Sequence, residues 1–170
     1  PDAILAASHL VLPGVGSFDP AIRKLKENTI LFNALEEAVI SSKTPLLGIC
    51  LGMQLLFDSS EEGSESGLGW IRGEVRHLSN INSNLAKIPN MGWTNIISVS
   101  SKQSILQRFY FVHSYYAEPK NMDDVLYTAF FGDEFTCGVK KGNIYGIQFH
   151  PEKSHAYGMD LFKRFIEGDL

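Results

Sequence analysis

The segment Gly48-Ile49-Cys50-Leu51-Gly52 constrains the fold of this chain more than any other. It follows the apolar run Pro45-Leu46-Leu47 and precedes the helical pattern Met53-Gln54-Leu55-Leu56-Phe57, which predicts a strand, a sharp turn and a helix. The pattern is the G-x-S-x-G nucleophile elbow with sulfur in place of oxygen, where neighbouring Cβ atoms would collide with the turn. We therefore expect a reactive Cys50 at a strand end, with the N–H groups of the following helix favouring its thiolate.

His150 ends a second strand-like pattern. The alternation Asn143-Ile144-Tyr145-Gly146-Ile147-Gln148-Phe149 runs into His150-Pro151-Glu152, and catalytic groups of open α/β sheets gather at strand ends. Pro151 biases His150 toward an extended backbone, so Glu152 can accept one ring N–H and leave the other nitrogen basic. Cys50, His150 and Glu152 are therefore the candidate nucleophile, base and orienting acid. Taken singly, the cysteine also fits an inert packed thiol, and the tripeptide fits a surface turn.

A glycine loop follows the first apolar stretch. Residues 3–12 are apolar except for Ser8 and His9, and they end in Pro13-Gly14-Val15-Gly16-Ser17-Phe18, which predicts a strand that leads into a loop. Such a loop can turn a backbone N–H toward a ligand oxygen and form an oxyanion hole with the N–H of Leu51. A plain strand-to-helix connection is the alternative.

Three motifs in this order resemble those of the class I glutamine amidotransferases, which release ammonia from glutamine: Pro13-Gly14-Val15-Gly16, the elbow from Gly48 to Gln54, and Gln148-Phe149-His150-Pro151-Glu152. Three further segments resemble the glutaminase subunits of imidazole glycerol phosphate synthase, an enzyme of histidine biosynthesis: Gly67-Leu68-Gly69-Trp70, Lys87-Ile88-Pro89-Asn90-Met91-Gly92-Trp93 and Tyr110-Phe111-Val112-His113-Ser114-Tyr115-Tyr116. The resemblance covers essentially the whole chain.

The resemblance implies an α/β, flavodoxin-like fold: an open, mostly parallel sheet with flanking helices and a β-rich second half. It also implies hydrolysis of L-glutamine to glutamate and ammonia, with no cofactor.

The resemblance assigns roles to further residues. The oxyanion hole is assigned to Val15, Gly16 and Leu51, substrate binding to Gly14, Gln54, Glu62, Ser114 and Tyr115, and a partner interface to Met91, Trp93 and Lys153. The implied partner is a cyclase subunit with a (β/α)8 barrel, which consumes the ammonia within a heterodimer. Plainer interpretations exist for some of these residues: Glu62 as a solvated charge in the polar loop 59–67, Gln54 as a helix-surface residue, and Trp93 as part of the core.

The N-terminus departs from the family pattern. Members of this group begin with a strand, a glycine turn and a helix ahead of the segment that corresponds to residues 3–12, and nothing here matches that opening. We therefore expect residues 1–170 to form a single glutamine amidotransferase domain that is truncated at its N-terminus and lacks the first βα unit. A parallel sheet without that unit exposes apolar faces and an unpaired edge.

Composition excludes several other classes of protein. The chain has 170 residues, 44% of them hydrophobic and 20% charged, as in an ordinary globular domain. The net charge is −4 and there are no runs of Lys and Arg, so the sequence does not indicate a nucleic-acid-binding surface. No apolar run is long enough to span a bilayer. Two cysteines without zinc spacing predict no metal site and favour a reducing compartment, the cytoplasm. Cys137 is interpreted as a packing residue.

Periodicity predicts the remaining elements. Helices are expected over residues 20–26, with Asp19 as the cap, over 31–40, from Cys50 to about Asp58, and over 159–166. Strands are expected over 110–116 and 134–140, with a hairpin turn at 140–143 and short strands and turns across 73–99. His113 is assigned a structural role, because it follows no elbow pattern and has no carboxylate nearby.

Two other functions fit parts of the sequence. A cysteine α/β-hydrolase acting on esters or lactones would share the elbow, but its acid usually lies between nucleophile and histidine, whereas Glu152 follows His150. A non-catalytic binding subunit would keep the fold without turnover. Trapping of a thioester with a glutamine analogue separates the first alternative from a glutaminase.

Overall fold

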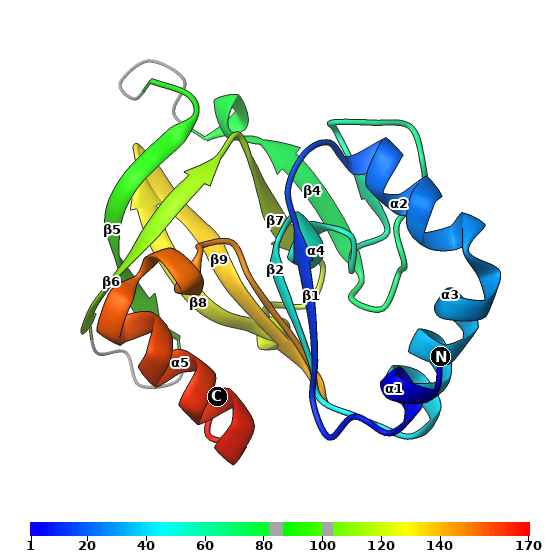
Figure 1. Ribbon diagram of the computed structural model, residues 1–170. Helices are drawn as coiled ribbons and strands as arrows, with labels where there is room; N and C mark the ends of the chain where they lie inside the picture. The colour runs from blue at the N-terminus through cyan, green and yellow to red at the C-terminus, as the bar shows by residue number, and fades with distance from the viewer. Residues whose placement is uncertain (82–86, 100–103) are drawn as a thin grey trace.

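The computed structural model describes residues 1–81, 87–99 and 104–170, and its strands form one curled sheet with helices packed on both faces (Figure 1). The strands are β1 (Leu10–Gly14), β2 (Leu46–Cys50), β3 (Ser59–Ser60), β4 (Gly73–His77), β5 (Asn90–Ser98), β6 (Ser104–His113), β7 (Tyr115–Pro119), β8 (Val125–Phe131), β9 (Asp133–Lys141) and β10 (Ile144–Ile147). The α-helices are α1 (Asp2–Leu5), α2 (Phe18–Glu27), α3 (Thr29–Glu36), α4 (Leu51–Gln54) and α5 (His155–Glu167). Short 3-10 turns cover Leu78–Asn80, Met122–Asp124 and Pro151–Lys153, and a π-helical turn, Glu37–Ser41, extends α3.

The parallel part of the sheet comes from segments far apart in the sequence. The main path of the sheet runs β1-β2-β10-β9-β7-β4-β3, and β1 and β10 both pair with β2 in parallel. The register places Gly14 beside Cys50 and Ile147 beside Ile49. The carboxyl ends of β1, β2 and β10 therefore meet at one edge, where open α/β sheets bind ligands.

Alternation along β2 supplies the two faces of the core. Leu46 packs with Leu35 and Val39 of the α3 segment, whereas the next residue, Leu47, belongs to the cluster that contains Leu161 and Phe165 of α5. Successive strand residues point to opposite faces, so an uninterrupted apolar strand requires cover on both sides. In Figure 1, α2 and α3 lie to one side of the sheet and α5 to the other.

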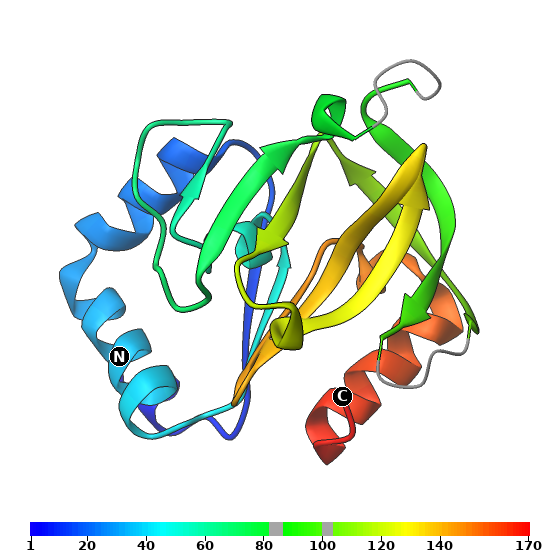
Figure 2. The ribbon, with the colours of Figure 1, turned by 180° about the vertical axis from the view of Figure 1, so that it is seen from behind.

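The second half of the chain is dominated by antiparallel pairing. β5 pairs with β6 and β8, β8 pairs with β9, and β9 pairs with β10, as seen from behind in Figure 2. Aromatic rings fill the interior here: Phe109 stacks on Phe149 at 4.1 Å between centroids, and Phe111 meets the same ring edge-on at 5.5 Å. The predicted α/β fold with a β-rich second half is confirmed.

Several predicted elements are confirmed in position. β9 and β10 form the expected hairpin across Gly142, whose φ of 60° lies in the left-handed region that glycine tolerates. Cys137 is fully buried in β9, as expected of a packing residue. The C-terminal helix α5 begins at His155, ahead of the predicted start. Part of the predicted strand-and-turn segment 73–99 lies in residues 82–86, outside the described residues.

Other predictions were wrong in detail. The apolar residues 3–12 are not one strand, because Asp2–Leu5 form the helical turn α1 and β1 starts at Leu10. The strand predicted over 110–116 is two strands, β6 and β7, broken at Ser114, whose carbonyl accepts from the Leu78 N–H at 2.9 Å. Asp19 is not the cap of α2, since Ser17 occupies that position and the Asp19 side chain binds another segment.

The helix after Cys50 is much shorter than its sequence pattern predicts. α4 ends at Gln54, although the apolar pattern continues to Asp58. The carbonyl groups that would continue the helix accept hydrogen bonds from a distant segment instead: Leu55 from Leu68, Leu56 from Ile71, and Phe57 from Gly69. Tertiary pairing thus overrides local propensity.

The outer side of β1 is open in the described part of the chain. β1 ends the main path of the sheet, and Val11 is 47% exposed. A pocket of ≈ 950 Å³ lies beside it, lined largely by apolar residues of β1, α2 and α4. Among the described helices, none combines the length and apolarity needed to cross a membrane.

Candidate active site

Cys50 stands in a strained backbone turn at the carboxyl end of β2. Its φ of 54° and ψ of −111° are unusual for a residue with a side chain, and it occupies the N-cap position of α4. Such conformations persist only where the surrounding structure enforces them, and they cluster at functional sites. The elbow predicted from the glycine spacing is therefore present.

The elbow glycines are required by close approach. A Cβ atom on Gly52 would lie 1.8 Å from the carbonyl oxygen of Leu12, and one on Gly48 would lie 2.8 Å from the carbonyl oxygen of Gly52. The backbones of β1, β2 and α4 are thus so close together that no space remains for a Cβ atom at either glycine. Replacement of either glycine would therefore require neighbouring backbone to shift.

A pocket of ≈ 400 Å³ opens above this turn. Its lining residues come from the glycine loop, the elbow, the polar loop after β3, the residue just before β5, the β6–β7 junction and the segment after β10. They are Val15, Gly16, Cys50, Leu51, Gln54, Glu62, Pro89, Val112, His113, Ser114, Tyr115, His150 and Lys153. Ten of these are residues that the sequence nominated. Gly14 and Glu152 line a smaller adjoining pocket of ≈ 200 Å³, together with Val15 and His150.

The imidazole of His150 is held in one orientation. Its Nδ1 lies 2.7 Å from Oε1 of Glu152, which the 3-10 turn Pro151–Lys153 places beside the ring. Within the described residues, the opposite nitrogen, Nε2, is buried without a hydrogen-bond partner. The carboxylate selects the tautomer that donates from Nδ1, so Nε2 carries a free lone pair.

The ionisation of Cys50 differs from the sequence expectation. Burial raises the pKa of the Cys50 thiol to about 11, although the Leu51 N–H and the Gln148 amide act in the opposite direction. The predicted stabilisation of a thiolate by the following helix was wrong in its net effect. α4 has only four residues, and desolvation outweighs its N–H groups. The resting thiol is therefore neutral, and a nucleophilic sulfur requires a base.

Gln148 is a site residue that the sequence reasoning did not single out. Its fully buried amide donates from Nε2 to Cys50 Sγ at 3.5 Å, and its Oε1 accepts from Gln54 Nε2 at 3.1 Å. Gln54 also donates to the Tyr115 carbonyl at 3.4 Å. Gln54 is therefore a buried part of the pocket wall and not a helix-surface residue. The signal for Gln148 was present in the sequence, since it stands directly before Phe149 and His150.

His113 has the structural environment that was predicted for it. Its Nδ1 donates to the Tyr115 carbonyl at 2.8 Å, and its Nε2 accepts from Asn90 Nδ2 at 2.9 Å. Burial lowers the pKa of His113 to about 4, so the ring is neutral at neutral pH. With both nitrogens engaged, it fixes the β6–β7 junction beside the pocket.

Glu62 and the glycine loop meet at the start of α2. The Glu62 carboxylate accepts from the Phe18 N–H at 2.9 Å, one residue after Ser17. Gly16 has a φ of 101°, which only glycine adopts easily, and Val15 is 84% exposed. The loop nominated as an oxyanion hole therefore borders the pocket together with Leu51.

The three residues nominated for a partner interface do not all lie at the pocket. Met91 and Trp93 are 62% and 38% exposed on β5 and line neither pocket, so Trp93 is not a core residue. Trp93 stacks on His155 at 5.7 Å and meets the ring of Tyr110 at 6.2 Å. Lys153 lines the pocket and lies over the Tyr110 ring at 5.8 Å. Lys153 and Tyr110 therefore connect the pocket to the exposed Trp93.

Among the described residues, no group of three or more His, Cys, Asp and Glu side chains is arranged to hold a metal ion. The chemistry available to the pocket is that of a thiol, an imidazole paired with a carboxylate, and backbone N–H groups.

These features agree with comparisons to known proteins. The chain belongs to the glutamine amidotransferase class-I family, whose model matches residues 4–167. It is 45% identical over 166 residues to imidazole glycerol phosphate synthase subunit HisH of Leptospira interrogans, with 94% of this chain and 81% of that protein covered. It is 48% identical over 173 residues to subunit HisH 2 of the same synthase from Methanococcus maripaludis, with 98% and 84% covered. The glutaminase domain of Trypanosoma brucei CTPS shares the fold, with a TM-score of 0.61, 17% identity and coverage of 99% and 74%.

Proposed function

We propose that this chain is the glutaminase subunit of an imidazole glycerol phosphate synthase, which hydrolyses L-glutamine and passes the ammonia to a cyclase subunit. The names of the similar proteins support the complex, and the pocket supports the chemistry. The observation that carries the proposal is that His150, whose Nδ1 is paired with Glu152, lines the same pocket as Cys50. Because Glu152 comes two residues after His150 and not between Cys50 and His150, the triad has the order expected of this family and not that of an α/β-hydrolase.

The first half of the proposed reaction forms a thioester. His150 Nε2 takes the proton of the neutral Cys50 thiol, and the sulfur attacks the carbon of the glutamine carboxamide. The N–H of Leu51 and an N–H of the Val15–Gly16 loop stabilise the oxyanion of the tetrahedral intermediate. The protonated His150 then gives its proton to the departing nitrogen, which leaves as ammonia while the carbonyl re-forms.

The second half releases glutamate. His150 deprotonates a water molecule, which attacks the thioester carbon, and the proton returns to the Cys50 sulfur as it leaves. Glu152 keeps the imidazole in one tautomer through both steps. Gly14, Gln54, Glu62, Ser114 and Tyr115 are proposed to bind the substrate, with Glu62 near the α-ammonium group.

The need to deliver ammonia without exposure to bulk water explains why this subunit would work with a partner. Free ammonia becomes protonated in bulk water and loses its nucleophilicity, so a protected route to a cyclase is useful. Met91, Trp93 and Lys153 are proposed to contact that subunit, a (β/α)8 barrel in a heterodimer. Exposed Trp and Met side chains serve as anchors in interfaces, and Lys153 borders both the pocket and the Tyr110–Trp93 pair.

Glutamate release tests the proposal. Glutamine is supplied to the chain alone, and to the chain mixed with the cyclase subunit and its nucleotide substrate. Cys50→Ala should abolish release, whereas Cys137→Ala, which changes the other cysteine, a fully buried one, should retain it. Release that increases with the partner and disappears only in Cys50→Ala supports a glutaminase subunit. A folded chain without release in either mixture contradicts it.

A further inference from the structure

The polar loop that carries Glu62 is fastened on both sides of this residue. The loop follows β3 and contains the sequence Glu61-Glu62-Gly63-Ser64-Glu65-Ser66-Gly67, whose composition predicts a solvated connection. Glu62 faces the pocket, and its carboxylate accepts from the Phe18 N–H. Its backbone N–H donates to Ser60 Oγ at 3.1 Å. The contacts that hold the loop before and after Glu62 therefore bear on where this carboxylate lies.

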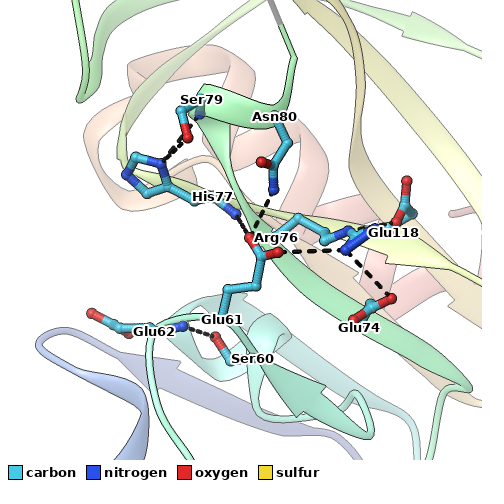
Figure 3. A network of polar contacts seen from close by, with 9 residues as sticks. All are labelled: Ser60, Glu61, Glu62, Glu74, Arg76, His77, Ser79, Asn80 and Glu118. Atoms are coloured by element: carbon cyan, nitrogen blue, oxygen red, sulfur yellow. Dashed lines mark hydrogen bonds and ion pairs between the residues drawn. The ribbon is translucent and has the colours of Figure 1, made fainter. Parts of the chain in front are cut away.

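Glu61 binds the loop to β4 and to the turn after it (Figure 3). Its Oε2 accepts from the His77 N–H at 2.6 Å and from Asn80 Nδ2 at 2.8 Å. Its Oε1 accepts from Arg76 Nη1 at 3.4 Å. In Figure 3 the Glu61 and Glu62 side chains leave the loop in different directions, Glu61 toward β4 and Glu62 away from it. Three donors from β4 and the turn after it thus fix the first neighbour of Glu62.

Asp19 binds the other end of the loop to α2. Its carboxylate accepts from the N–H groups of Ser64 and Glu65 at 3.1 and 3.0 Å. A Cβ atom on Gly63 would lie 1.9 Å from Asp19 Oδ1, so the glycine is what allows this approach. The loop is therefore held before Glu62 by the Glu61 carboxylate and after it by the Asp19 carboxylate, and neither of these carboxylates lines the pocket.

We propose that Glu61 and Asp19 are positioning residues that hold the Glu62 carboxylate where it recognises the α-ammonium group of glutamine. This inference rests on the proposed glutaminase function. On an unrestrained loop a carboxylate is surrounded by water, which screens its attraction for a cation. A carboxylate that is held at the wall of a pocket binds a positively charged ligand more tightly than a neutral one. Neither Glu61 nor Asp19 lines the pocket, so each acts through Glu62.

The test compares glutamine with glutaramate, the same amide without the α-amino group. Steady-state kinetics are measured with the full chain in complex with its cyclase subunit. Glu61→Ala and Asp19→Ala should each raise KM for glutamine about 5- to 20-fold with kcat within about threefold, as expected for loss of uniform substrate binding. Turnover of glutaramate should be unchanged in both variants. The preference for glutamine over glutaramate should therefore fall about tenfold, as it should in Glu62→Ala.

Glu74→Ala is the matched control. Glu74 lies 3.8 Å from the same Arg76 guanidinium and is 47% exposed, but it belongs to β4 and not to the loop. The preference of this variant should therefore stay within about twofold of the unchanged chain. Thermal unfolding checks that each variant is folded, and Glu61→Gln replaces Glu61→Ala if the latter is not.

Three results overturn the inference: an unchanged preference in both Glu61 and Asp19 variants, an unchanged preference in Glu62→Ala, or equal losses for glutamine and glutaramate. A chain that hydrolyses no glutamine refutes the proposed function separately. Equilibrium binding of glutamine and glutaramate to Cys50→Ala chains that carry the same substitutions then decides the positioning role: loss of preference supports it, and an unchanged preference overturns it.

Discussion

Nδ1 of His150 lies 2.7 Å from Oε1 of Glu152, and the other ring nitrogen is buried without a hydrogen-bond partner among the described residues. The carboxylate thus determines which nitrogen carries the proton, although Glu152 itself is half exposed. In the proposed mechanism this contact acts through the tautomer it selects more than through the stability of the ion pair, because exposed pairs contribute little to folding.

Substitution of Glu152 tests the tautomer directly. In Glu152→Gln the new amide N–H can donate to Nδ1, which moves the ring proton to Nε2 and removes the base. We expect kcat/KM for glutamine to fall by about 10³- to 10⁴-fold, the loss typical of a wrong tautomer in a triad. Glu152→Ala only releases the ring, so its loss should be at least about tenfold smaller. Glu134→Gln, a surface carboxylate bonded to Thr128, should be unaffected. Equal losses in the two Glu152 variants would contradict selection of the tautomer.

The neutral state of Cys50 predicts an unusual alkylation profile. With its pKa raised to about 11 by burial, the thiolate fraction rises about tenfold for each pH unit through the neutral range. The rate of alkylation by iodoacetamide should therefore increase from about pH 7 to about pH 9 without a plateau, followed by mass spectrometry of the Cys50 peptide. Cys137 is fully buried and serves as the internal control, since it should remain unlabelled in the folded chain. A plateau below about pH 8 would mean that a stable thiolate exists.

The amide of Gln148 is the one side-chain hydrogen-bond donor that the described structure places on the Cys50 sulfur, at 3.5 Å. Gln148→Leu keeps the approximate volume but removes this donor, so the thiolate loses stabilisation and the alkylation rate at about pH 8 should fall about 3- to 10-fold, the effect of roughly 1 kcal/mol. Gln54→Leu removes the donor to Gln148 Oε1 and leaves the Gln148 hydrogen bond to the sulfur in place. The alkylation rate should therefore fall less in Gln54→Leu than in Gln148→Leu. An alkylation rate in Gln148→Leu equal to that of the unchanged chain would exclude a role for the amide.

The parts of the site that sequence predicts are those fixed by local chemistry. The glycines around Cys50 can only serve a close turn, and Pro151 fixes the relation of His150 to Glu152, so the elbow and the imidazole–carboxylate pair follow from neighbours in the chain. The hairpin at Gly142 follows for the same reason.

The parts that sequence did not predict depend on distant contacts. α4 ends at Gln54 because backbone N–H groups of the segment 68–71 donate to the carbonyl groups that would continue the helix. The sequence of residues 51–58 contains no signal for these contacts. The high pKa of Cys50 results from burial of the sulfur in the fold. The sequence indicates that a helix follows Cys50, but it does not show how deeply the thiol is buried. Asp19 has the position of a helix cap in the sequence, but its partners, Ser64 and Glu65, lie in another loop.

The backbone of Cys50 predicts a reversed order of stability between two substitutions. At φ 54° any side chain strains the turn by about 1–3 kcal/mol, whereas glycine does not. Cys50→Gly should therefore be at least as stable as Cys50→Ala in urea unfolding, despite the roughly 0.5–1 kcal/mol that glycine normally loses to alanine. Cys137 lies in the regular strand β9 without a positive φ, so Cys137→Gly should be less stable than Cys137→Ala. The same order at both cysteines would show that the elbow is not strained.

Buried His113 predicts a dependence of stability on pH. Its pKa is about 4 in the folded chain, because burial disfavours the charged ring, against 6.5 ordinarily. Below pH 6.5 the unfolded chain therefore binds a proton that the folded chain does not, so the free energy of unfolding falls as the pH falls, until the folded ring is protonated near pH 4. Between about pH 7.5 and about pH 5 this imidazole should lower the stability by about 2 kcal/mol. His113→Gln removes the titrating group, so its stability should change less across the same range in parallel urea titrations, even though the variant is less stable at neutral pH. Curves of stability against pH that run parallel for the two chains would refute the assignment of a neutral, buried His113.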